Sequence, residues 1–289
     1  ACAEDLGATG DLTSALLPAP AAPVTARVVP RRPGILCGLA LGPAIGEVFS
    51  RRLGQPITFA PAAASAGRPW TDGDAIHGGE TVATLHGPQA AVLSTERTLL
   101  NFLGRLSGVA TLTRAYVNRA RAANPRVAVL DTRKTLPGWR ELDKYAVRVG
   151  GGTNHRAGLH DAVLIKDNHL AGIPTDRLAA ELPGLLARVS GHVPPPQFIE
   201  VEVDSLAQLD QVLRVPGVDI ILLDNFSTAD LRAAVAARGV TVAPHRPLLE
   251  ASGGVTLDTI AAIAATGVDR ISVGALTHSA VGLDLGLDL

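Results

Sequence analysis

Six short apolar runs, each long enough for one strand, follow one another from residue 127 onward, and they constrain the fold of this 289-residue chain most. Several end in a polar or charged residue, and helical stretches such as 205–215, 228–239 and 256–267 lie between many of them. Near-continuous apolar strands that alternate with helices indicate a parallel sheet covered by helices. With their polar ends, the runs cover 127–134, 162–169, 198–205, 219–225, 247–254 and 270–275.

The predicted sheet also sets where a functional site would lie. Right-handed crossovers keep such strands parallel, so their C-terminal ends open on the same side. A (β/α) barrel carries its active site on that side. The stretch of about 150 residues is short for a complete eight-fold barrel of ~250 residues. We therefore expect an α/β protein with an incomplete (β/α) barrel.

The first hundred residues mix shorter predicted elements. The Ala- and Pro-rich segment 60–69 has no periodic apolar face and is expected to form a surface loop. Residues 87–124 form a predicted helix, since Pro88 suits a first helical position and leucines recur at spacings of three and four. The pair Ser107–Gly108 is expected to bend or divide this helix. The strand and helix candidates before it are 25–31, 44–53 and 80–87.

Composition excludes several classes of function. The net charge of −1 gives no global basic field that would attract nucleic acid. No apolar run approaches the ~20 residues that span a bilayer, and the first residues lack the basic start and apolar stretch of a signal peptide. The two cysteines form no CxxC pair; they could form one disulfide, but two thiols in a reducing cytosol are favoured. We expect a cytoplasmic protein that binds neither nucleic acid nor membrane.

The strand ends present a concentration of cations. The first and second runs end at Arg133–Lys134 and Lys166, while His155–Arg156 lies in a glycine-rich loop. Of 26 basic residues only three are lysines, so each lysine calls for a reason. Arginine offers a planar fork that suits a carboxylate, whereas lysine is a compact charge that tolerates many oxygen geometries. Clustered cations of both kinds predict a carboxylate or phosphate ligand.

Acidic residues and glycines lie at the same predicted edge. Glu202 and Asp224 cannot face a polyanion directly, but they could hold Mg²⁺ together with substrate phosphates or accept from sugar hydroxyls. Glu200 shares a strand face with Glu202, and one of the two can simply be an ion-pair partner. The loops 252–254 and 273–275 offer backbone N–H groups where barrels often hold a phosphate.

Plainer interpretations exist for each feature alone, because isolated lysines are usually solvated and a Ser-Gly-Gly run is usually a turn. Their agreement at one end of the predicted strands favours a joint site for a polyanion and a metal ion.

These same segments closely resemble quinolinate phosphoribosyltransferase, a family also called nicotinate-nucleotide pyrophosphorylase (carboxylating). The likeness runs in order from residue 4 to residue 289, and its central block, 131–169, is highly specific. The family has further residues before this start, so the chain is expected to be trimmed. The other segments that carry the resemblance are 95–111, 200–213, 222–227, 249–254 and 273–289.

The resemblance implies a type II phosphoribosyltransferase. Its N-terminal α/β sandwich domain would cover residues 1–108, with the tail 276–289 returning to it, and the incomplete α/β barrel with the active site would cover 109–275. Such enzymes are homodimers, or multiples of dimers, whose active site takes an arginine from the neighbouring subunit. The implied reaction joins quinolinate to the ribose of 5-phosphoribosyl 1-pyrophosphate with Mg²⁺. It yields nicotinate mononucleotide, pyrophosphate and CO₂ in de novo NAD synthesis.

The resemblance also assigns residue roles by motif. Arg97 matches the arginine donated across the dimer, and Lys134, with Thr132 beside it, matches the lysine on the pyrophosphate side. Lys134, Lys166, Glu202 and Asp224 form the expected catalytic set, in which Glu202 and Asp224 serve Mg²⁺ and the ribose hydroxyls. The expected quinolinate-carboxylate binders are Arg133, His155, Arg156 and Lys166. The expected ribose 5-phosphate loops contain Ser252, Gly253, Gly254, Gly274 and Ala275.

One segment departs from the family, since 243–248 is longer and richer in proline than expected. Lys144, on a predicted helix, is assigned no role. Two rival functions remain: a related phosphoribosyltransferase acting on nicotinate or in a molybdenum-linked role, and a non-catalytic barrel that senses a sugar phosphate. The full cation set favours a dicarboxylate, and a sensor would have no use for the Glu202–Asp224 pair.

Overall fold

The computed structural model divides into two compact units. The N-terminal unit contains residues 1–112 and 280–289, and the barrel unit contains residues 113–279. Helix α3 (Gln89–Ala123) begins in the first and ends in the second. The unusual segment 243–248 lies partly outside the described residues, at 243–245. The structure describes residues 1–17, 23–64, 67–189, 191–240 and 246–289.

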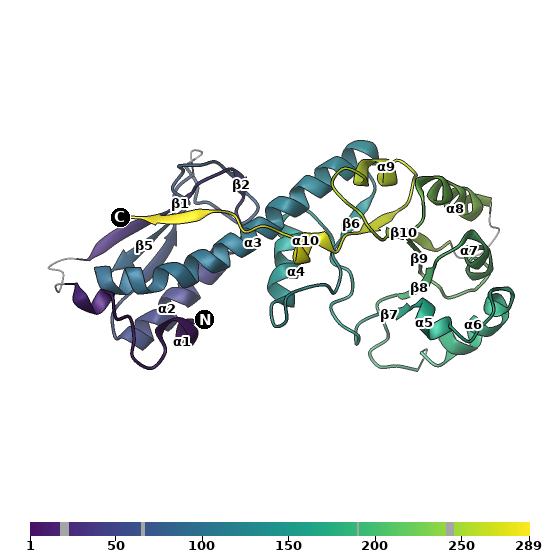
Figure 1. Ribbon diagram of the computed structural model, residues 1–289, viewed down its shortest axis with the longest axis horizontal. Coiled ribbons are helices and arrows are strands. Elements are labelled where there is room, and N and C mark those ends of the chain that lie inside the picture. The colour runs from purple at the N-terminus through teal and green to yellow at the C-terminus, as the bar shows by residue number, and fades with distance from the viewer. Residues whose placement is uncertain (18–22, 65–66, 190, 241–245) are drawn as a thin grey trace. The chain divides into compact units, whose positions relative to one another are not determined.

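A four-stranded antiparallel sheet forms the centre of the N-terminal unit (Figure 1). Its order is β12-β1-β5-β3, so the C-terminal strand pairs with β1 along residues 27–30. Strands β2 and β4 form a separate two-stranded sheet. The strands are β1 (Val24–Pro30), β2 (Gly34–Ile35), β3 (Thr58–Pro61), β4 (Ala75–Ile76), β5 (Ala83–Gly87) and β12 (Leu285–Asp288). The helices are α1 (Cys2–Leu6), η1 (Ser14–Leu16), η2 (Leu39–Leu41) and α2 (Gly42–Leu53).

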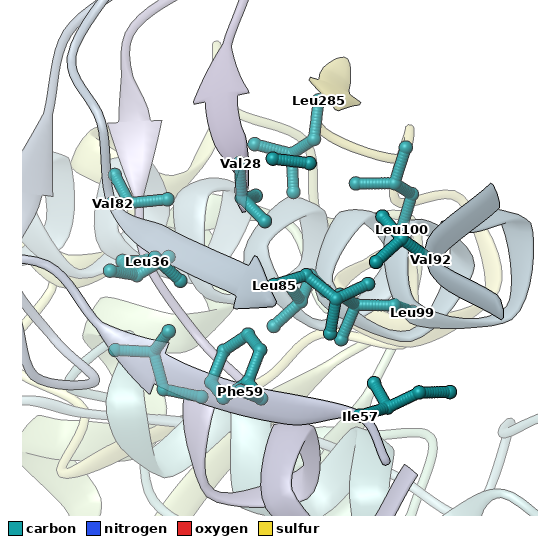
Figure 2. Packing of buried hydrophobic residues seen from close by; sticks show 14 of the residues in the cluster. Val28, Leu36, Ile57, Phe59, Val82, Leu85, Val92, Leu99, Leu100 and Leu285 are labelled. Atoms are coloured by element: carbon teal, nitrogen blue, oxygen red, sulfur yellow. The ribbon is translucent and has the colours of Figure 1, made fainter. Parts of the chain in front are cut away.

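Alternate residues of these strands and the apolar stripe of α3 form one core (Figure 2). Val28 and Leu85 on the sheet, and Leu99 on α3, are fully buried. Complete burial of such a side chain stabilises the fold by roughly 1.5–3 kcal/mol. The predicted leucine stripe therefore serves as the helical layer of the α/β sandwich.

The predicted break at Ser107–Gly108 is wrong, because α3 continues unbroken through both residues. The Ser107 hydroxyl accepts a hydrogen bond from the Cys37 N–H at 3.0 Å and donates to the Cys37 carbonyl at 3.2 Å. A Cβ on Gly108 would lie 2.2 Å from the Val281 carbonyl oxygen. Both residues are small so that neighbouring backbone can approach the helix.

The predicted surface loop at 60–69 is partly wrong. Its first two residues complete strand β3, where Ala60 pairs with Thr84 and Pro61 with Ala83. Strand β3 lies at the edge of the sheet, a place that tolerates proline. The remainder of the segment, apart from residues 65–66, which lie outside the described part, contains only an isolated bridge.

Six parallel strands form the barrel unit, each within a predicted apolar run. Their order is β6-β11-β10-β9-β8-β7, and within the described residues no pairing joins β7 to β6. The barrel is therefore incomplete, as predicted. The strands are β6 (Ala128–Leu130), β7 (Val163–Ile165), β8 (Ile199–Val203), β9 (Ile220–Asp224), β10 (Leu248–Ser252) and β11 (Arg270–Ser272).

Helices follow the strands of this unit, as Figure 1 shows for α7 and α8. Because every strand runs the same way, the loops after their C-terminal ends gather on one side. Within the described part of the chain, no helix is both long and apolar enough to span a membrane. The helices are α4 (Arg140–Val149), α5 (Asp167–Leu170), η3 (Thr175–Arg177), α6 (Leu178–Ala187), α7 (Leu206–Val212), α8 (Thr228–Val240), α9 (Ile260–Ala264) and α10 (Ala275–His278).

Candidate active site

A cavity of about 840 Å³ opens in the barrel unit, at the C-terminal ends of the parallel strands. It lies entirely within this unit, since every residue on its wall falls between 132 and 278. Residues far apart in sequence are brought together because each follows a strand of one sheet. The predicted residues on its wall are Thr132, Arg133, Lys134, His155, Arg156, Lys166, Glu202, Asp224, Ser252, Gly253, Gly254, Gly274 and Ala275.

Arg97 is the one predicted residue that does not lie among the described residues of the wall. It belongs to the part of α3 in the N-terminal unit. Its side chain is 64% exposed and lies 3.8 Å from the carboxylate of Glu96. It is thus open to solvent in this single chain.

Two arginines give the cavity its positive wall. The Nε of Arg133 is buried and has no hydrogen-bond partner among the described residues. Arg156 is buried too, and one of its terminal nitrogens donates to the Ala162 carbonyl at 3.3 Å. Burial, and then the charge of Arg133, lower the pKa of the Arg156 guanidinium. Two like charges held this close favour an anionic ligand, which would relieve their repulsion.

Lys134 enters the cavity from the loop after β6. Its backbone N–H donates to the Thr132 hydroxyl at 3.0 Å, and its carbonyl accepts from the Thr277 hydroxyl at 2.8 Å. A Cβ on Gly274 would lie 3.0 Å from Cδ of Lys134. The glycine therefore leaves room for the lysine stem, whose exposed ammonium can meet a ligand.

The two predicted metal acids lie on adjacent strands, β8 and β9. Glu202 is mostly buried, and its Oε2 lies 3.2 Å from Nζ of the half-exposed Lys166. Asp224 Oδ2 accepts from Asn225 Nδ2 at 2.7 Å. Carboxylate oxygens are among the ligands that Mg²⁺ prefers.

A tight turn follows β10. Gly253 and Gly254 have φ of 100° and 57°, and the neighbouring Asn225 has φ of 56°. The Asn225 N–H donates to the Ser252 carbonyl at 2.9 Å, which joins the loops after β9 and β10. A Cβ on Gly253 would lie 2.1 Å from Oδ1 of Asn225. Only glycine fits there.

A buried ionisable group lies behind the cations. Nε2 of His155 lies 2.9 Å from Oε2 of Glu200 and 3.5 Å from Oε1 of Glu250. Glu250 Oε2 in turn accepts from Arg270 Nε at 2.6 Å. Burial raises the pKa of Glu200. Burial lowers the pKa of His155, but the Glu200 contact and the charge of Glu250 outweigh it, so the pKa of His155 is raised.

Glu250 also lines the cavity, although it is not among the predicted site residues. It stands two residues before Ser252 on the same strand, so the period of two placed it on the same face. This spacing is visible in the sequence and could have indicated Glu250 as a site residue. One of Glu200 and Glu202 was expected to be an ion-pair partner. In the structure both have a basic neighbour, His155 for Glu200 and Lys166 for Glu202.

Lys144, for which the sequence indicated no role, has one in the structure. It is buried, and its Nζ donates to Asp131 Oδ1 at 2.6 Å and to the His155 carbonyl at 3.0 Å. Asp131 also accepts from the His155 N–H at 2.8 Å and from Asn154 Nδ2 at 2.6 Å. Lys144 and Asp131 thus join the loop after β6 to the loop that carries His155 and Arg156.

Other wall residues also escaped the sequence analysis. Ser272 is the last residue of β11 and His278 the last residue of α10, and neither was predicted; Asn225 follows β9 directly and was expected only as a strand-end residue without a role. The rest of the wall consists of Leu164, Leu222, Val255 and Thr256.

Comparison with known proteins agrees with this arrangement. The profile "Quinolinate phosphoribosyl transferase, N-terminal domain" matches residues 11–107, and the corresponding C-terminal domain profile matches residues 109–288. The nicotinate-nucleotide pyrophosphorylase [carboxylating] of Mycobacterium leprae is 42% identical over 99% of this chain and 93% of its own length. A probable enzyme of the same name from Bacillus subtilis is 40% identical over 99% and 90%.

Solved structures give the same result. The crystal structure of NadC from Streptococcus pyogenes has a TM-score of 0.83 and 34% identity, covering 100% of this chain and 93% of that one. The nicotinate-nucleotide pyrophosphorylase of Francisella tularensis has a TM-score of 0.81 and 38% identity, covering 99% and 92%. Two domain profiles that together span nearly the whole chain, and relatives this similar over their full length, show that the chain belongs to the quinolinate phosphoribosyl transferase family.

Proposed function

We propose that this chain transfers the phosphoribosyl group of 5-phosphoribosyl 1-pyrophosphate to quinolinate and removes one carboxylate as CO₂. The products are nicotinate mononucleotide and pyrophosphate, in a step of de novo NAD synthesis. The observation that carries the proposal is a cavity on whose wall cations, three carboxylates and glycine turns lie together. Family membership indicates the reaction, and the cavity wall offers side chains and turns that suit both substrates.

Quinolinate would bind at the arginine wall. Arg133 offers a buried Nε–H with no partner among the described residues, and Arg156 lies close enough for the two charges to repel. A dicarboxylate satisfies both, since guanidinium groups pair with carboxylates in a fork geometry. His155 and Lys166 complete the set proposed for the carboxylates.

Phosphoribosyl pyrophosphate would bind at the glycine turns and at Lys134. The turn Ser252–Gly254, together with Gly274 and Ala275, would receive the 5-phosphate through backbone N–H groups. Lys134, with Thr132 beside it, would face the pyrophosphate. A compact ammonium suits this group, because the negative charge on the leaving oxygens shifts as the bond breaks.

Glu202 and Asp224 would hold Mg²⁺ together with substrate phosphates, and they would also accept from ribose hydroxyls. The donor chemistry fits, since both offer hard carboxylate oxygens. When bound, the ion would neutralise charge on the leaving pyrophosphate. Lys134 adds to that neutralisation, and the two carboxylates stabilise the positive charge that develops on the ribose ring.

The chemistry then needs no separate electron-accepting cofactor. The pyridine nitrogen attacks the ribose carbon as pyrophosphate departs, and the ring becomes cationic. This cationic ring accepts the electron pair released when the adjacent carboxylate leaves as CO₂. Since two polyanionic substrates must be held together, positioning by the cationic wall is a main contribution of the protein.

We further propose that the enzyme is a homodimer, or a multiple of dimers, in which Arg97 reaches the cavity of the partner subunit. The exposure of Arg97 in the single chain supports this, since a donated side chain must be free to leave its own unit. We also place the enzyme in the cytoplasm, because Cys2 and Cys37 are both free thiols, as suits a reducing compartment.

One assay tests the function. Purified protein is given phosphoribosyl pyrophosphate and Mg²⁺ with either quinolinate or nicotinate, and pyrophosphate and CO₂ are both measured. We expect both products with quinolinate and neither with nicotinate or after chelation of the metal. Pyrophosphate release with nicotinate alone would favour the rival transferase, and no release with either would favour a sensor.

A further inference from the structure

Helix α4 carries a second basic residue that contacts the loops of the cavity, one turn before Lys144. This residue, Arg140, is half-buried, and its guanidinium donates two hydrogen bonds. Nε donates to the Thr135 hydroxyl at 3.1 Å, and Nη1 donates to the Ala157 carbonyl at 3.1 Å. The described residues of the cavity wall include neither Arg140 nor its two acceptors. Its route to a bound substrate is therefore through the residues that it holds.

The two acceptors belong to the two loops that carry the arginine wall. Thr135 follows Lys134 in the loop after β6, and its N–H donates to the Arg133 carbonyl at 2.9 Å. Ala157 directly follows Arg156. One guanidinium group thus links the loop of the first arginine to the loop of the second. An arginine suits this link, because its planar fork offers donors from more than one nitrogen, whereas lysine has only one.

The linked loops carry charges that repel each other. Burial, and then the charge of Arg133, lower the pKa of Arg156, so the two guanidinium groups are close enough to interact. This repulsion favours separation of the two loops when no anion is bound. A link between Thr135 and Ala157 opposes the separation. It holds the two arginines at a fixed spacing, which is the condition for one dicarboxylate to meet both.

Lys134 is anchored independently of this link. Its carbonyl accepts from the Thr277 hydroxyl at 2.8 Å, and its N–H donates to the Thr132 hydroxyl at 3.0 Å. Loss of Arg140 should therefore disturb the spacing of the two wall arginines more than the position of Lys134.

We propose that Arg140 is a positioning residue for quinolinate, which sets the spacing of Arg133 and Arg156 by linking the loops on which they lie. The inference rests on the proposed function, since that function assigns quinolinate to the arginine wall. The role differs from that of Lys144, which joins buried parts of the same loops. Because Arg140 is only half-buried and holds neutral acceptors, its loss should affect binding geometry more than stability.

The Arg140→Ala variant tests this proposal, with the concentrations of quinolinate and phosphoribosyl pyrophosphate varied separately. We expect the quinolinate KM to rise about tenfold, as for a small displacement of groups that position a substrate. The KM for phosphoribosyl pyrophosphate should change little. Guanidinium ion added below denaturing concentrations should lower the raised KM, whereas sodium chloride at the same ionic strength should not. Arg140→Lys should restore little, because one nitrogen replaces two donors.

Arg114→Ala is the matched control. Arg114 is also half-buried, and it also donates from two nitrogens of its guanidinium, to the carbonyls of Gly150 at 2.9 Å and Val149 at 3.2 Å. These acceptors lie at the C-terminal end of α4, whereas Arg140 is the first residue of that helix. The control removes the same kind of contact and should leave both KM values unchanged.

Thr135→Val gives a second test that does not depend on the Arg140 variants folding well. It preserves the shape of the side chain and removes the hydroxyl that accepts from Arg140. Alone it should raise the quinolinate KM by a smaller factor than Arg140→Ala. In the Arg140→Ala background it should cause no further rise, because the bond is already absent.

The proposal is overturned if Arg140→Ala leaves the quinolinate KM unchanged or raises both KM values equally. It is also overturned if Arg140→Lys restores the wild-type KM, or if Thr135→Val adds its full effect to that of Arg140→Ala. A wild-type enzyme that releases no CO₂ from quinolinate would instead overturn the proposed function, so the two failures are distinguishable.

Discussion

Nζ of Lys144 lies 2.6 Å from Oδ1 of Asp131, and both side chains are buried. Asp131 directly precedes Thr132 and also accepts from the His155 N–H. The pair therefore connects the two loops that carry the cationic wall. Sequence patterns gave Lys144 no role. The ion pair accounts for one of the three lysines in a chain that otherwise uses arginine, because only a slender ammonium reaches both Asp131 and the His155 carbonyl.

Breaking this pair should be costly. Lys144→Met leaves the Asp131 carboxylate buried without its cation, and removal of one partner of a buried pair costs about 3–5 kcal/mol. Denaturant unfolding measures this loss. The matched control is Asp210→Asn, which removes an exposed ion pair with Arg214 and should cost no more than about 0.5 kcal/mol. Equal effects in the two variants would contradict the structural role of Lys144.

Arg133→Ala and Arg156→Ala should weaken quinolinate binding selectively. Each removes charge-assisted hydrogen bonds worth about 1.5–3 kcal/mol, so the quinolinate KM should rise roughly ten- to hundredfold. The KM for phosphoribosyl pyrophosphate should change little. Kinetics that vary each substrate separately check this, with the exposed Arg188→Ala as control. If both variants kept the quinolinate KM and turnover of the wild type, the assignment of the arginine wall would fail.

Lys134→Ala should show the opposite pattern. The ammonium is proposed to neutralise the departing pyrophosphate, so its loss should lower kcat, by roughly 100-fold for one electrostatic group. Single-turnover measurement of pyrophosphate release tests this, and Lys134→Arg serves as the charge-preserving comparison. Restoration of full activity by arginine would show that charge alone suffices there.

Gly253→Ala should damage the phosphate loop. The added Cβ would lie 2.1 Å from Oδ1 of Asn225, and φ of 100° is strained for any side chain. Such strain costs roughly 1–3 kcal/mol, and the displaced turn should raise the KM for phosphoribosyl pyrophosphate. Gly172→Ala is the control, because nothing lies within 4 Å of its added Cβ. Similar kinetics in the two variants would count against a phosphate role for the turn.

Arg97 should act in trans if the proposed dimer is correct. Arg97→Ala and Lys166→Ala should each be inactive alone, yet a refolded equimolar mixture should recover about a quarter of wild-type activity, since half the dimers are hybrids with one intact site. Mixing Lys134→Ala with Lys166→Ala is the control, because both changes lie in the same cavity and no hybrid site is complete. Equal recovery in both mixtures, or none in the first, would argue against a shared arginine.

The sequence was sufficient for the six parallel strands and for most of the cavity wall. Short apolar runs such as 220–223, which alternate with helical segments, indicate strands buried on both faces. Parallel order then places Lys134, Lys166 and Asp224 at one edge. The break predicted at Ser107–Gly108 failed for a physical reason. Small residues mark either a weak point in a helix or a close contact, and only the position of Cys37 and the Val281 carbonyl distinguishes these cases.

The sequence by itself determined which residue types stand at the strand ends, because the apolar runs and the residues that follow them can be read along the chain. Only the tertiary structure decided which charges are paired. Lys144 on a helix and Glu250 inside a strand look like ordinary solvated or strand residues until folding removes water from them. Once water is excluded, the buried charge of Lys144 needs Asp131 beside it, and that of Glu250 needs His155. A linear pattern does not show which charged residues lose their water.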